Sequence, residues 1–305
     1  MRYAISIPQF IEDGSFDPAA LRAYLSEAEE FGFESGWTQE QVLGTMPSVS
    51  PLEMMTYAAA CTERLRLGCV VFVTPLHSPV HLAKALSSLD QLSRGRLEIG
   101  VGTGGLARPF GAFGVDPTGL VARFNEGLAL MKSLWTEPSV TLDGRFWQLD
   151  GAPMEPKPFQ KPYPPIWFGG SAPAALRRAV RHGNGFFGAG SQTTANFVDQ
   201  VRLVHEEVAR QERDPATFQI AKRVYIGVGD ESVKGRVADA LGQLYRTAGL
   251  DIAEVAVSGS PDECAAGLRA VAEGGAELIL LNTLFDESDQ MHRLANEVLP
   301  QLKDL

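Results

Sequence analysis

Short apolar segments alternate along the chain with longer segments in which apolar residues recur at helical spacing. The short segments are rich in β-branched and aromatic residues, which is typical of strands. They predict eight strands, at residues 3–8, 33–38, 65–74, 96–102, 166–170, 185–189, 219–228 and 277–281. The longer segments predict helices at residues 18–31, 51–61, 79–92, 122–135, 173–181, 194–211, 231–246, 262–273 and 290–302.

Several of the predicted helices begin with a capping signal. Asp17, Ser50 and Ser78 each stand directly before a proline. Their side-chain oxygens can accept from the N–H groups that a helix start leaves unbonded, and proline suits the first helical position because it has no N–H of its own. These signals support the starts of the first three helices.

The order of the elements predicts the fold class. Strands separated by helices form parallel sheets, and eight such units predict a (β/α)8 TIM barrel that binds ligands at the carboxyl ends of its strands. We expect residues 1–305 to form this barrel as a single domain; an open, doubly wound α/β sheet is the alternative. Residues 137–165 interrupt the alternation between the fourth and fifth strands with a hairpin signal and a proline-rich stretch. We interpret them as an insertion that packs near the barrel mouth.

The stretch "GVGTGG" at the end of the fourth predicted strand matches a dinucleotide-binding pattern through Gly100, Gly102 and Gly105. That pattern requires a helix directly after the glycines. Here Pro109 and Pro117 come before the next helical segment. The context therefore argues against a Rossmann site, and the glycines are expected to allow close approach to a ligand or to a neighbouring strand.

The composition narrows the classes of partner. The 305 residues carry a net charge of −10 without any basic run, which argues against nucleic acid. The sequence shows neither a membrane-spanning apolar stretch nor a signal-peptide pattern, so we expect a cytoplasmic protein without a membrane partner. Cys61, Cys69 and Cys264 form no CxxC pair and are expected to be reduced, buried thiols.

Polar residues follow the predicted strands at the end where a barrel binds ligands. Glu40 and Gln41 follow the second strand, His77 the third, and Thr103 and Arg108 the fourth. His77 can act as a general acid or base because its ordinary pKa is near neutrality; the alternative is a loop histidine bonded to the backbone. Glu40 can hydrogen-bond a ligand, or it is a solvated loop carboxylate.

Two strand-to-helix connections are rich in glycine. Gly169, Gly170 and Ser171 follow the fifth strand, and Gly188 and Ala189 open the connection after the sixth. Free N–H groups at helix starts, together with the helix dipole, favour an anion such as phosphate. The alternative at both places is a tight turn without a ligand.

Motifs for other kinds of chemistry are missing. His77 and His81 lack the intervening glutamate of a zinc-protease motif, and no metal-ligand cluster appears. The sequence also lacks G-x-S-x-G and any catalytic-cysteine signature. Few nucleophiles and many backbone-lined loops favour a bound cofactor that performs the chemistry.

Four longer stretches resemble a known family. They are "GFESGWTQEQ", "ERLRLGCVVFVTPLHSPVHLAKALSSLDQLSRGRLEIGVGTGG", "EGLALMKSLWTEPSVTLDGRFWQLDG" and "PKPFQKPYPPIWFGGSAPAALRRAVRHGNGFFGAG". Over about residues 3–300 the chain resembles the bacterial-luciferase-like flavin and deazaflavin oxidoreductases, and most of all their F420-dependent branch. The resemblance implies a (β/α)8 barrel, hydride transfer with coenzyme F420, a small-molecule substrate and a homodimer. An FMN-dependent monooxygenase is the alternative, and a protein that binds a deazaflavin or flavin without catalysis is a third hypothesis.

The resemblance also implies where the cofactor binds. Its tricyclic ring would lie over the barrel mouth, supported by a bulge in the third strand with a cis peptide bond at Val70–Val71. Thr103 would line the same mouth from the fourth strand. The phosphate end would meet the two glycine-rich connections described above.

Two positions depart from the family's pattern. Well-studied deazaflavin-dependent members of the family carry Asp-His where this chain, like the branch it resembles most, has Glu40 and Gln41. Some members also carry a glutamate at the position of Gly105. A glutamine side chain does not exchange protons, so the usual acid and base are both missing. The resemblance therefore does not carry the family's sugar-phosphate or alcohol dehydrogenase reactions to this chain. Glu40, Gln41 and His77 are the candidate catalytic residues.

Overall fold

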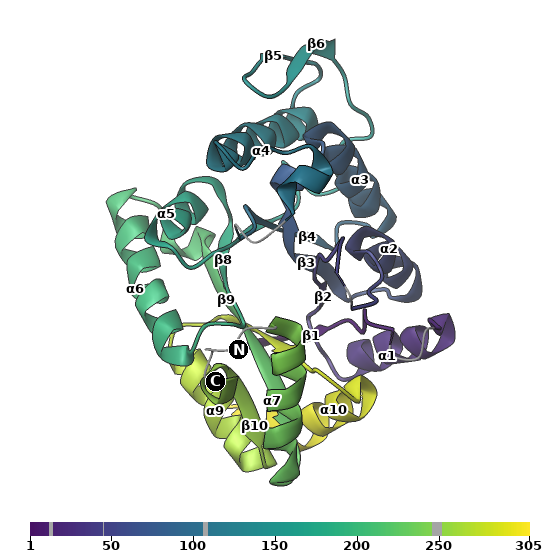
Figure 1. Cartoon of the computed structure of the whole chain (residues 1–305), viewed down its shortest axis with the longest axis vertical. Coiled ribbons are helices and arrows are strands. Elements are labelled where there is room, and N and C mark those ends of the chain that lie inside the picture. Colours follow the sequence, from purple (N-terminus) through teal and green to yellow (C-terminus); the bar gives the residue numbers. More distant parts are fainter. Residues whose placement is uncertain (12–14, 45, 106–108, 246–251) are drawn as a thin grey trace. The chain divides into compact units, whose positions relative to one another are not determined.

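The structure is a computed structural model that describes residues 1–11, 15–44, 46–105, 109–245 and 252–305 (Figure 1). The chain divides into two compact units. Unit 1 consists of Met1–Pro8, Phe16–Trp37 and Trp167–Leu305, and unit 2 consists of Gln9–Ser15 and Thr38–Ile166. The expectation of a single domain over residues 1–305 stays a prediction.

The main sheet contains all eight predicted strands. They are β1 (Arg2–Ser6), β2 (Ser35–Thr38), β3 (Arg66–Val73), β4 (Leu97–Gly102), β7 (Ile166–Gly169), β8 (Gly185–Gly188), β9 (Gln219–Val228) and β11 (Leu278–Asn282). In hydrogen-bonded order they run β9-β11-β1-β2-β3-β4-β7-β8, and β8 also pairs with β9, so the order returns to its start. This closed order confirms the TIM barrel and excludes the open sheet.

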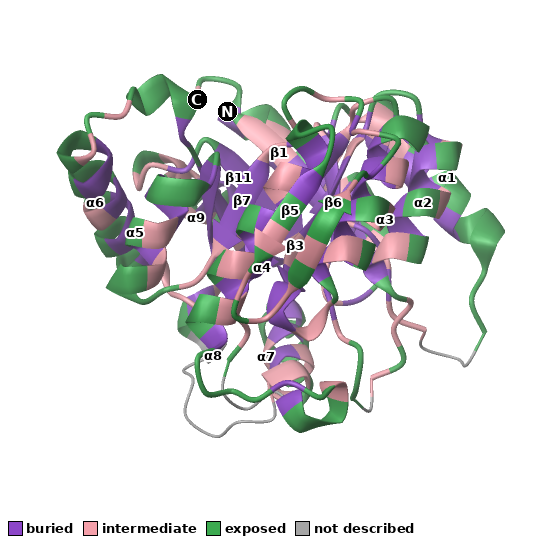
Figure 2. Cartoon of the chain, turned by 90° about the horizontal axis from the view of Figure 1, so that it is seen from above, coloured by how far each residue is buried: buried purple, intermediate pink, exposed green. Residues whose placement is uncertain are grey.

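Helices follow the strands as predicted. They are α1 (Pro18–Glu30), α2 (Pro51–Cys61), α3 (Pro79–Leu92), α4 (Leu120–Thr136), α5 (Pro173–His182), α6 (Thr194–Arg210), α7 (Ser232–Tyr245) and α9 (Pro261–Glu273). The side chains of Asp17 and Ser78 accept from backbone N–H groups at the starts of α1 and α3, whereas Ser50 bonds the side chain of Glu53 instead. In Figure 2, α5 and α6 each carry buried and exposed stripes, which is the pattern expected of helices packed on a sheet.

A short strand in the C-terminal part was not predicted. β10 (Ala256–Gly259) follows α8 (Ile252–Val255) and pairs in parallel with residues 225–228 at the end of β9. The sequence predicted an irregular connection here, because each element has only four residues and gives too short a periodic signal. The end predicted for the seventh helix, Arg246, lies outside the described residues.

The closing helix is less regular than predicted. In place of one helix over residues 290–302, the chain forms α10 (Glu287–Arg293), a π-helical turn (Leu294–Val298) and a 3₁₀ turn (Leu299–Leu302). Pro300 lies in the last of these turns. Because proline has no N–H to donate, it cannot continue the α-helical hydrogen bonds.

The insertion contains the predicted hairpin, which lies beyond α4 in Figure 1. β5 (Val140–Asp143) and β6 (Gln148–Ala152) pair antiparallel. The carboxylate of Glu126 on α4 accepts from the N–H groups of residues 145, 146 and 147 at 3.1, 2.8 and 3.1 Å. One side chain of the helix therefore anchors the turn that precedes β6.

Arg123 connects the hairpin to the loop after β3. Its guanidinium carbon lies 4.7 Å from the centroid of the Trp147 ring, and its Nε donates to the carbonyl oxygen of Pro75 at 3.2 Å. The 3₁₀ turn Thr74–Leu76, which contains Pro75, directly follows the carboxyl end of β3. The hairpin turn thus lies on the side of unit 2 where β3 ends.

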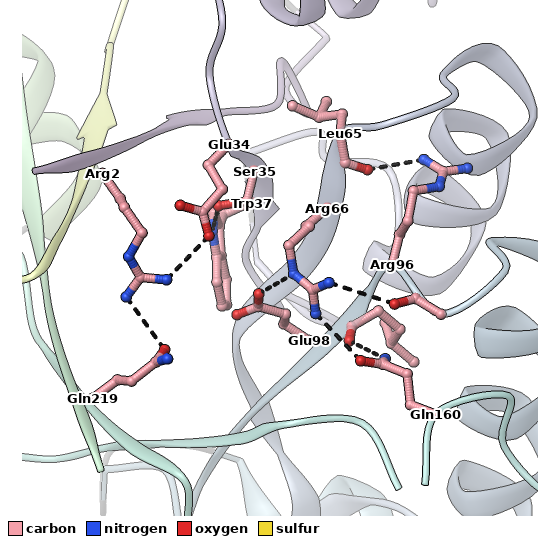
Figure 3. A network of polar contacts seen from close by, with 12 residues as sticks. Arg2, Glu34, Ser35, Trp37, Leu65, Arg66, Arg96, Glu98, Gln160 and Gln219 are labelled. Carbon is pink, nitrogen blue, oxygen red and sulfur yellow. Dashed lines mark hydrogen bonds and ion pairs between the residues drawn. The ribbon is translucent and has the colours of Figure 1, made fainter. Parts of the chain in front are cut away.

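Polar residues at the starts of the strands are bonded to one another (Figure 3). In unit 1, Arg2 donates to Glu34 at 3.1 Å and to Gln219 at 3.3 Å. In unit 2, Arg66 pairs with Glu98, which is 5% exposed. A buried carboxylate is tolerated when a cation and hydrogen bonds compensate it. The amino ends of these strands therefore have their charges paired.

Buried aromatic rings pack against one another in unit 1. The Trp37 ring lies edge-on to Phe187, at 4.8 Å between centroids, and to Trp167, at 6.2 Å. The Trp37 indole donates to the hydroxyl of Ser35 at 2.9 Å, so the one polar atom of this buried side chain is satisfied.

We expect Glu126→Ala to release the hairpin turn. Three backbone donors lose their acceptor, which should lower the free energy of unfolding by about 1–3 kcal/mol. Hydrogen–deuterium exchange of residues 144–148 should become at least about tenfold faster, because these amides open locally. Asn125→Ala, at an exposed position of the same helix, is the control. Equal exchange in both variants would show that Glu126 does not anchor the turn.

Candidate active site

The third strand carries the predicted bulge. The register of β3 against β4 shifts between Cys69 and Phe72, where three residue steps on β3 face two on β4. The Val70–Val71 peptide bond lies in this segment and is cis. Both observations confirm the expectation for this strand, which came from the resemblance.

The glycines of "GVGTGG" pack against the bulge. A Cβ atom at Gly100 would lie 2.1 Å from the carbonyl oxygen of Cys69, and one at Gly102 would lie 2.7 Å from the Val71 side chain. A larger residue at position 100 would require the backbone of β3 to shift, and one at position 102 would require the Val71 side chain to move. These two glycines therefore serve close strand packing, one of the two roles expected from the sequence. Gly105 differs, because a Cβ there would meet nothing within 4 Å.

Glu40 is a buried carboxylate with both oxygens bonded. Its side chain is 2% exposed. One oxygen accepts from the N–H of Val73 at 2.7 Å, and the other lies 2.7 Å from Nε2 of His77. The structure thus brings two of the sequence-predicted residues into direct contact, and it contradicts the interpretation of Glu40 as a solvated loop carboxylate.

The loop that carries Glu40 is held by a buried glutamine. The amide nitrogen of Gln9 donates to the carbonyl oxygens of Gln39 and Val49 at 2.8 and 2.6 Å, and its oxygen accepts from the N–H of Gln39 at 2.9 Å. Gln41 does not join the carboxylate–histidine pair. Its side-chain amide instead folds over Gly44. A Cβ added at Gly44 would lie 2.2 Å from the amide nitrogen of Gln41.

Two threonines lie at the strand ends of unit 2. Thr74, directly after β3, is 8% exposed, and its buried hydroxyl has no partner among the described residues. The sequence places Thr74 after the third strand, but it gave no reason to choose this residue as a site residue, because a threonine after a strand is common. Thr103, after β4, is half-buried and donates to the neighbouring carbonyl of Gly104 at 3.4 Å. Arg108 lies outside the described residues.

The first glycine-rich connection belongs to unit 1. Gly169 ends β7, and Gly170 has a φ of +142°. Ser171 is exposed, and Ala172 precedes α5 without a side-chain cap. The start of α5 is therefore not closed by a protein side chain, which is compatible with an anion there.

The second connection contains a feature that the sequence analysis missed. Gly188 ends β8, and the carbonyl oxygen of Ala189 accepts from the ammonium of Lys222 on β9. Lys222 is 2% exposed. Burial, followed by the field of Arg223, lowers the pKa of Lys222 to about 7. The only sequence signal was a charged pair inside an otherwise apolar strand.

Other kinds of site find no support in the described part of the chain. Groups of three or more metal-ligating side chains are absent from it, and none of its helices combines the length and apolar character needed to cross a bilayer. The cysteines form no disulfide among these residues; Cys69 and Cys264 are buried, whereas Cys61 is only half-buried, so that part of the cysteine prediction was wrong.

A model of the family described as luciferase-like monooxygenase matches residues 1–245. The match covers most of the chain, and the fold agrees with it. The chain therefore belongs to the luciferase-like monooxygenase family, which confirms the resemblance found in the sequence.

The relatives of this chain include an uncharacterized protein and two enzymes that are named for different cofactors. The chain is 34% identical over 161 residues to an uncharacterized protein, y4vJ, from Sinorhizobium fredii, covering 52% of this chain and 46% of that one. It is 29% identical over 326 residues to an F420-dependent glucose-6-phosphate dehydrogenase from Beutenbergia cavernae, covering 94% of each. It is also 29% identical over 200 residues to an FMNH(2)-dependent dimethylsulfone monooxygenase from Pseudomonas putida, covering 64% of this chain and 53% of that one. The second and third of these relatives are named as oxidoreductases that act on small molecules.

Solved structures share the fold over the whole chain. A monooxygenase, RslO1, from Streptomyces bottropensis has a TM-score of 0.83 at 23% identity, with 99% of this chain and 100% of that one covered. An F420-dependent secondary alcohol dehydrogenase, in complex with an F420–acetone adduct, also has a TM-score of 0.83, at 18% identity and 99% coverage of both chains. At these identities the likeness supports the barrel fold alone.

We expect Gly100→Ala to destabilise the protein, because the added methyl group would overlap the carbonyl oxygen of Cys69. Overpacking of this kind costs about 1–3 kcal/mol of the free energy of unfolding. Urea unfolding measures it, and Gly105→Ala is the matched control in open space. If the two variants unfold at the same urea concentration, the contact at position 100 is not a constraint.

Proposed function

We propose that this protein is an oxidoreductase that uses coenzyme F420 for hydride transfer with a small organic substrate. The Glu40–His77 pair is the observation that carries the proposal. Gln41 does not exchange protons, whereas an imidazole bonded to a buried carboxylate can. The relative that matches over 94% of this chain and is F420-dependent supports the choice of cofactor.

Unit 2 has features that fit the ring of such a cofactor. The bulge at Val70 and Val71 adds backbone surface at the end of β3, and Thr103 follows the neighbouring strand. The buried hydroxyl of Thr74 has no partner among the described residues, and such a group is costly unless a ligand completes its hydrogen bond. We assign the ring to this group of residues. When bound, a reduced deazaflavin supplies the hydride.

The protein's own contribution is to hold and move a proton. Glu40 binds Nε2 of His77 and so leaves Nδ1 as the ring nitrogen that takes or releases a proton. The N–H of Val73 fixes the other oxygen of Glu40, and the Phe72 ring stands edge-on to the imidazole at 6.1 Å. Because the carboxylate cannot rotate without losing a bond, the imidazole keeps one orientation.

Unit 1 has features that fit the phosphate end. Gly169, Gly170 and Ser171 lead into the uncapped start of α5, and Gly188 and Ala189 lead toward α6. N–H groups and helix dipoles at such starts favour phosphate. Arg177 is exposed one turn into α5, and an acidic tail such as that of F420 requires a basic exit of this kind.

A second candidate is an FMN-dependent monooxygenase, which the FMNH(2)-dependent relative supports. A binding protein without catalysis is the third, because both usual proton-transfer groups are missing. Fluorescence quenching by F420 and by FMN distinguishes the F420-dependent oxidoreductase from the FMN-dependent monooxygenase. Turnover of reduced F420 over a panel of carbonyl substrates distinguishes the F420-dependent enzyme from a binding protein without catalysis. The homodimer stays a prediction.

We expect Ser171→Glu to weaken binding of F420 roughly five- to tenfold, because a carboxylate beside a bound phosphate would repel it. Ser171→Gln has nearly the same shape without the charge and should bind almost as well as wild type. The exposed position of Ser171 leaves the fold intact in both. The measurement is fluorescence titration at low salt. Identical dissociation constants for the two variants would place the phosphate elsewhere.

We expect His77→Gln to lower kcat with reduced F420 by about 100-fold or more, since it removes a general acid or base. Glu40→Gln should have the same direction of effect, because it releases the imidazole. His81→Gln, at an exposed position of α3, is the matched histidine control and should retain full activity. Cofactor affinity should change less than about threefold in all three. Wild-type turnover by His77→Gln would remove this residue from the mechanism.

A further inference from the structure

Lys222 is a buried lysine whose ammonium group bonds backbone carbonyl oxygens. It is 2% exposed, and its ammonium donates to the carbonyl oxygens of Ala189 and Gln192. Across the described residues it forms no ion pair with a carboxylate, and the charged neighbour that acts on it is another cation, Arg223. A cation withdrawn from water is costly unless an anion joins it. The arrangement is therefore incomplete as it stands.

Lys222 also sets the direction of the peptide groups in the connection after β8. In a trans peptide unit, the C=O and the N–H that follows it point to opposite sides. The carbonyl oxygens of Ala189 and Gln192 turn toward Lys222, so the N–H groups of Gly190 and Thr193 turn away from it. This opposite side of the loop presents backbone donors, and the positive end of α6 follows directly.

Close packing fixes this arrangement. The Lys222 ammonium lies 5.7 Å from the centroid of the Phe197 ring. A Cβ at Gly188 would lie 2.7 Å from that ring and 3.1 Å from the stem of Lys222, and a Cβ at Gly190 would lie 2.7 Å from the ring of Tyr225. The two glycines are thus needed for the loop to lie against both aromatic rings. The packing of the loop against these rings therefore determines which two carbonyl oxygens Lys222 bonds.

We propose that Lys222 is a positioning residue for the phosphate of the cofactor: it holds the connection after β8 so that the N–H groups of Gly190 and Thr193 turn outward, and it supplies positive charge behind them. The inference rests on the proposed function, because it requires a cofactor that carries a phosphate. Both F420 and FMN do, so it holds for either cofactor.

The test compares ligands that share a ring and differ at the phosphate end. FMN is compared with riboflavin, and F420 with the deazaflavin nucleoside that lacks phosphate and tail. Fluorescence titration with these four ligands gives four dissociation constants for each protein. The proteins are wild type, Lys222→Met, Lys222→Gln and Lys222→Arg. We expect wild type to prefer a phosphorylated ligand, and the Met and Gln variants to lose about tenfold or more of that preference, as expected when a charged partner is removed. The Arg variant should retain most of it.

The ratio within each ligand pair separates a phosphate role from a structural one. If the role of Lys222 is structural, Lys222→Met should weaken binding of both ligands of a pair equally and leave the ratio of their dissociation constants unchanged. That result would overturn this inference but not the proposed function. If Lys222→Met does not fold, Lys222→Gln, which keeps a donor for the loop carbonyls, decides by the same ratio. Lys303→Met, at an exposed position, controls for net charge and should leave all constants unchanged. Wild-type protein that binds neither FMN nor F420 would overturn the proposed function, and this inference with it.

Discussion

The close approach of β3 to β4 is the constraint on which the contact between Glu40 and His77 in unit 2 depends. The carbonyl oxygen of Cys69 occupies the space that any side chain at position 100 would need. Directly after this contact β3 gains its extra residue, and Val73 then faces Gly102. From that position its N–H meets Glu40, which in turn holds His77. Gly100 and Gly102 on β4 thereby fix the position of the Glu40 carboxylate, which follows β2.

Much of the fold could be predicted because its signals are local. α2 and α3 begin and end at the predicted residues, since proline marks each start and a polar turn follows each end. Strands buried on both faces read as apolar runs between these helices. β10 escaped prediction because its four residues pair with the long strand β9, and only the three-dimensional structure reveals that partner. The bulge at Val70–Val71 could be expected from the family resemblance, since nothing in a run of β-branched residues marks one extra residue.

The site could be predicted only in part, because its contacts join residues that are distant in the sequence. Glu40 and His77 were each plausible as separate residues, but their contact depends on the loop that Gln9 holds. Lys222 lies inside an apolar strand, and a sequence pattern does not show whether such a side chain reaches an acid, water or a carbonyl group. The "GVGTGG" motif shows the opposite case: its spacing suggested a nucleotide, while two of its glycines serve the packing of a bulge.

Polar groups at the amino ends of the strands have more complete partners than those near the carboxyl ends. At the amino ends, Arg66 pairs with Glu98 and Arg2 with Glu34, so these charges are compensated within the protein and support the fold. Beside the carboxyl end of β8, the hydrogen bonds that Lys222 makes among the described residues all go to carbonyl oxygens. The Thr74 hydroxyl has none among the described residues. A protein that buries polar groups without completing their bonds accepts a loss of stability there. A ligand that completed those bonds would gain the corresponding free energy on binding.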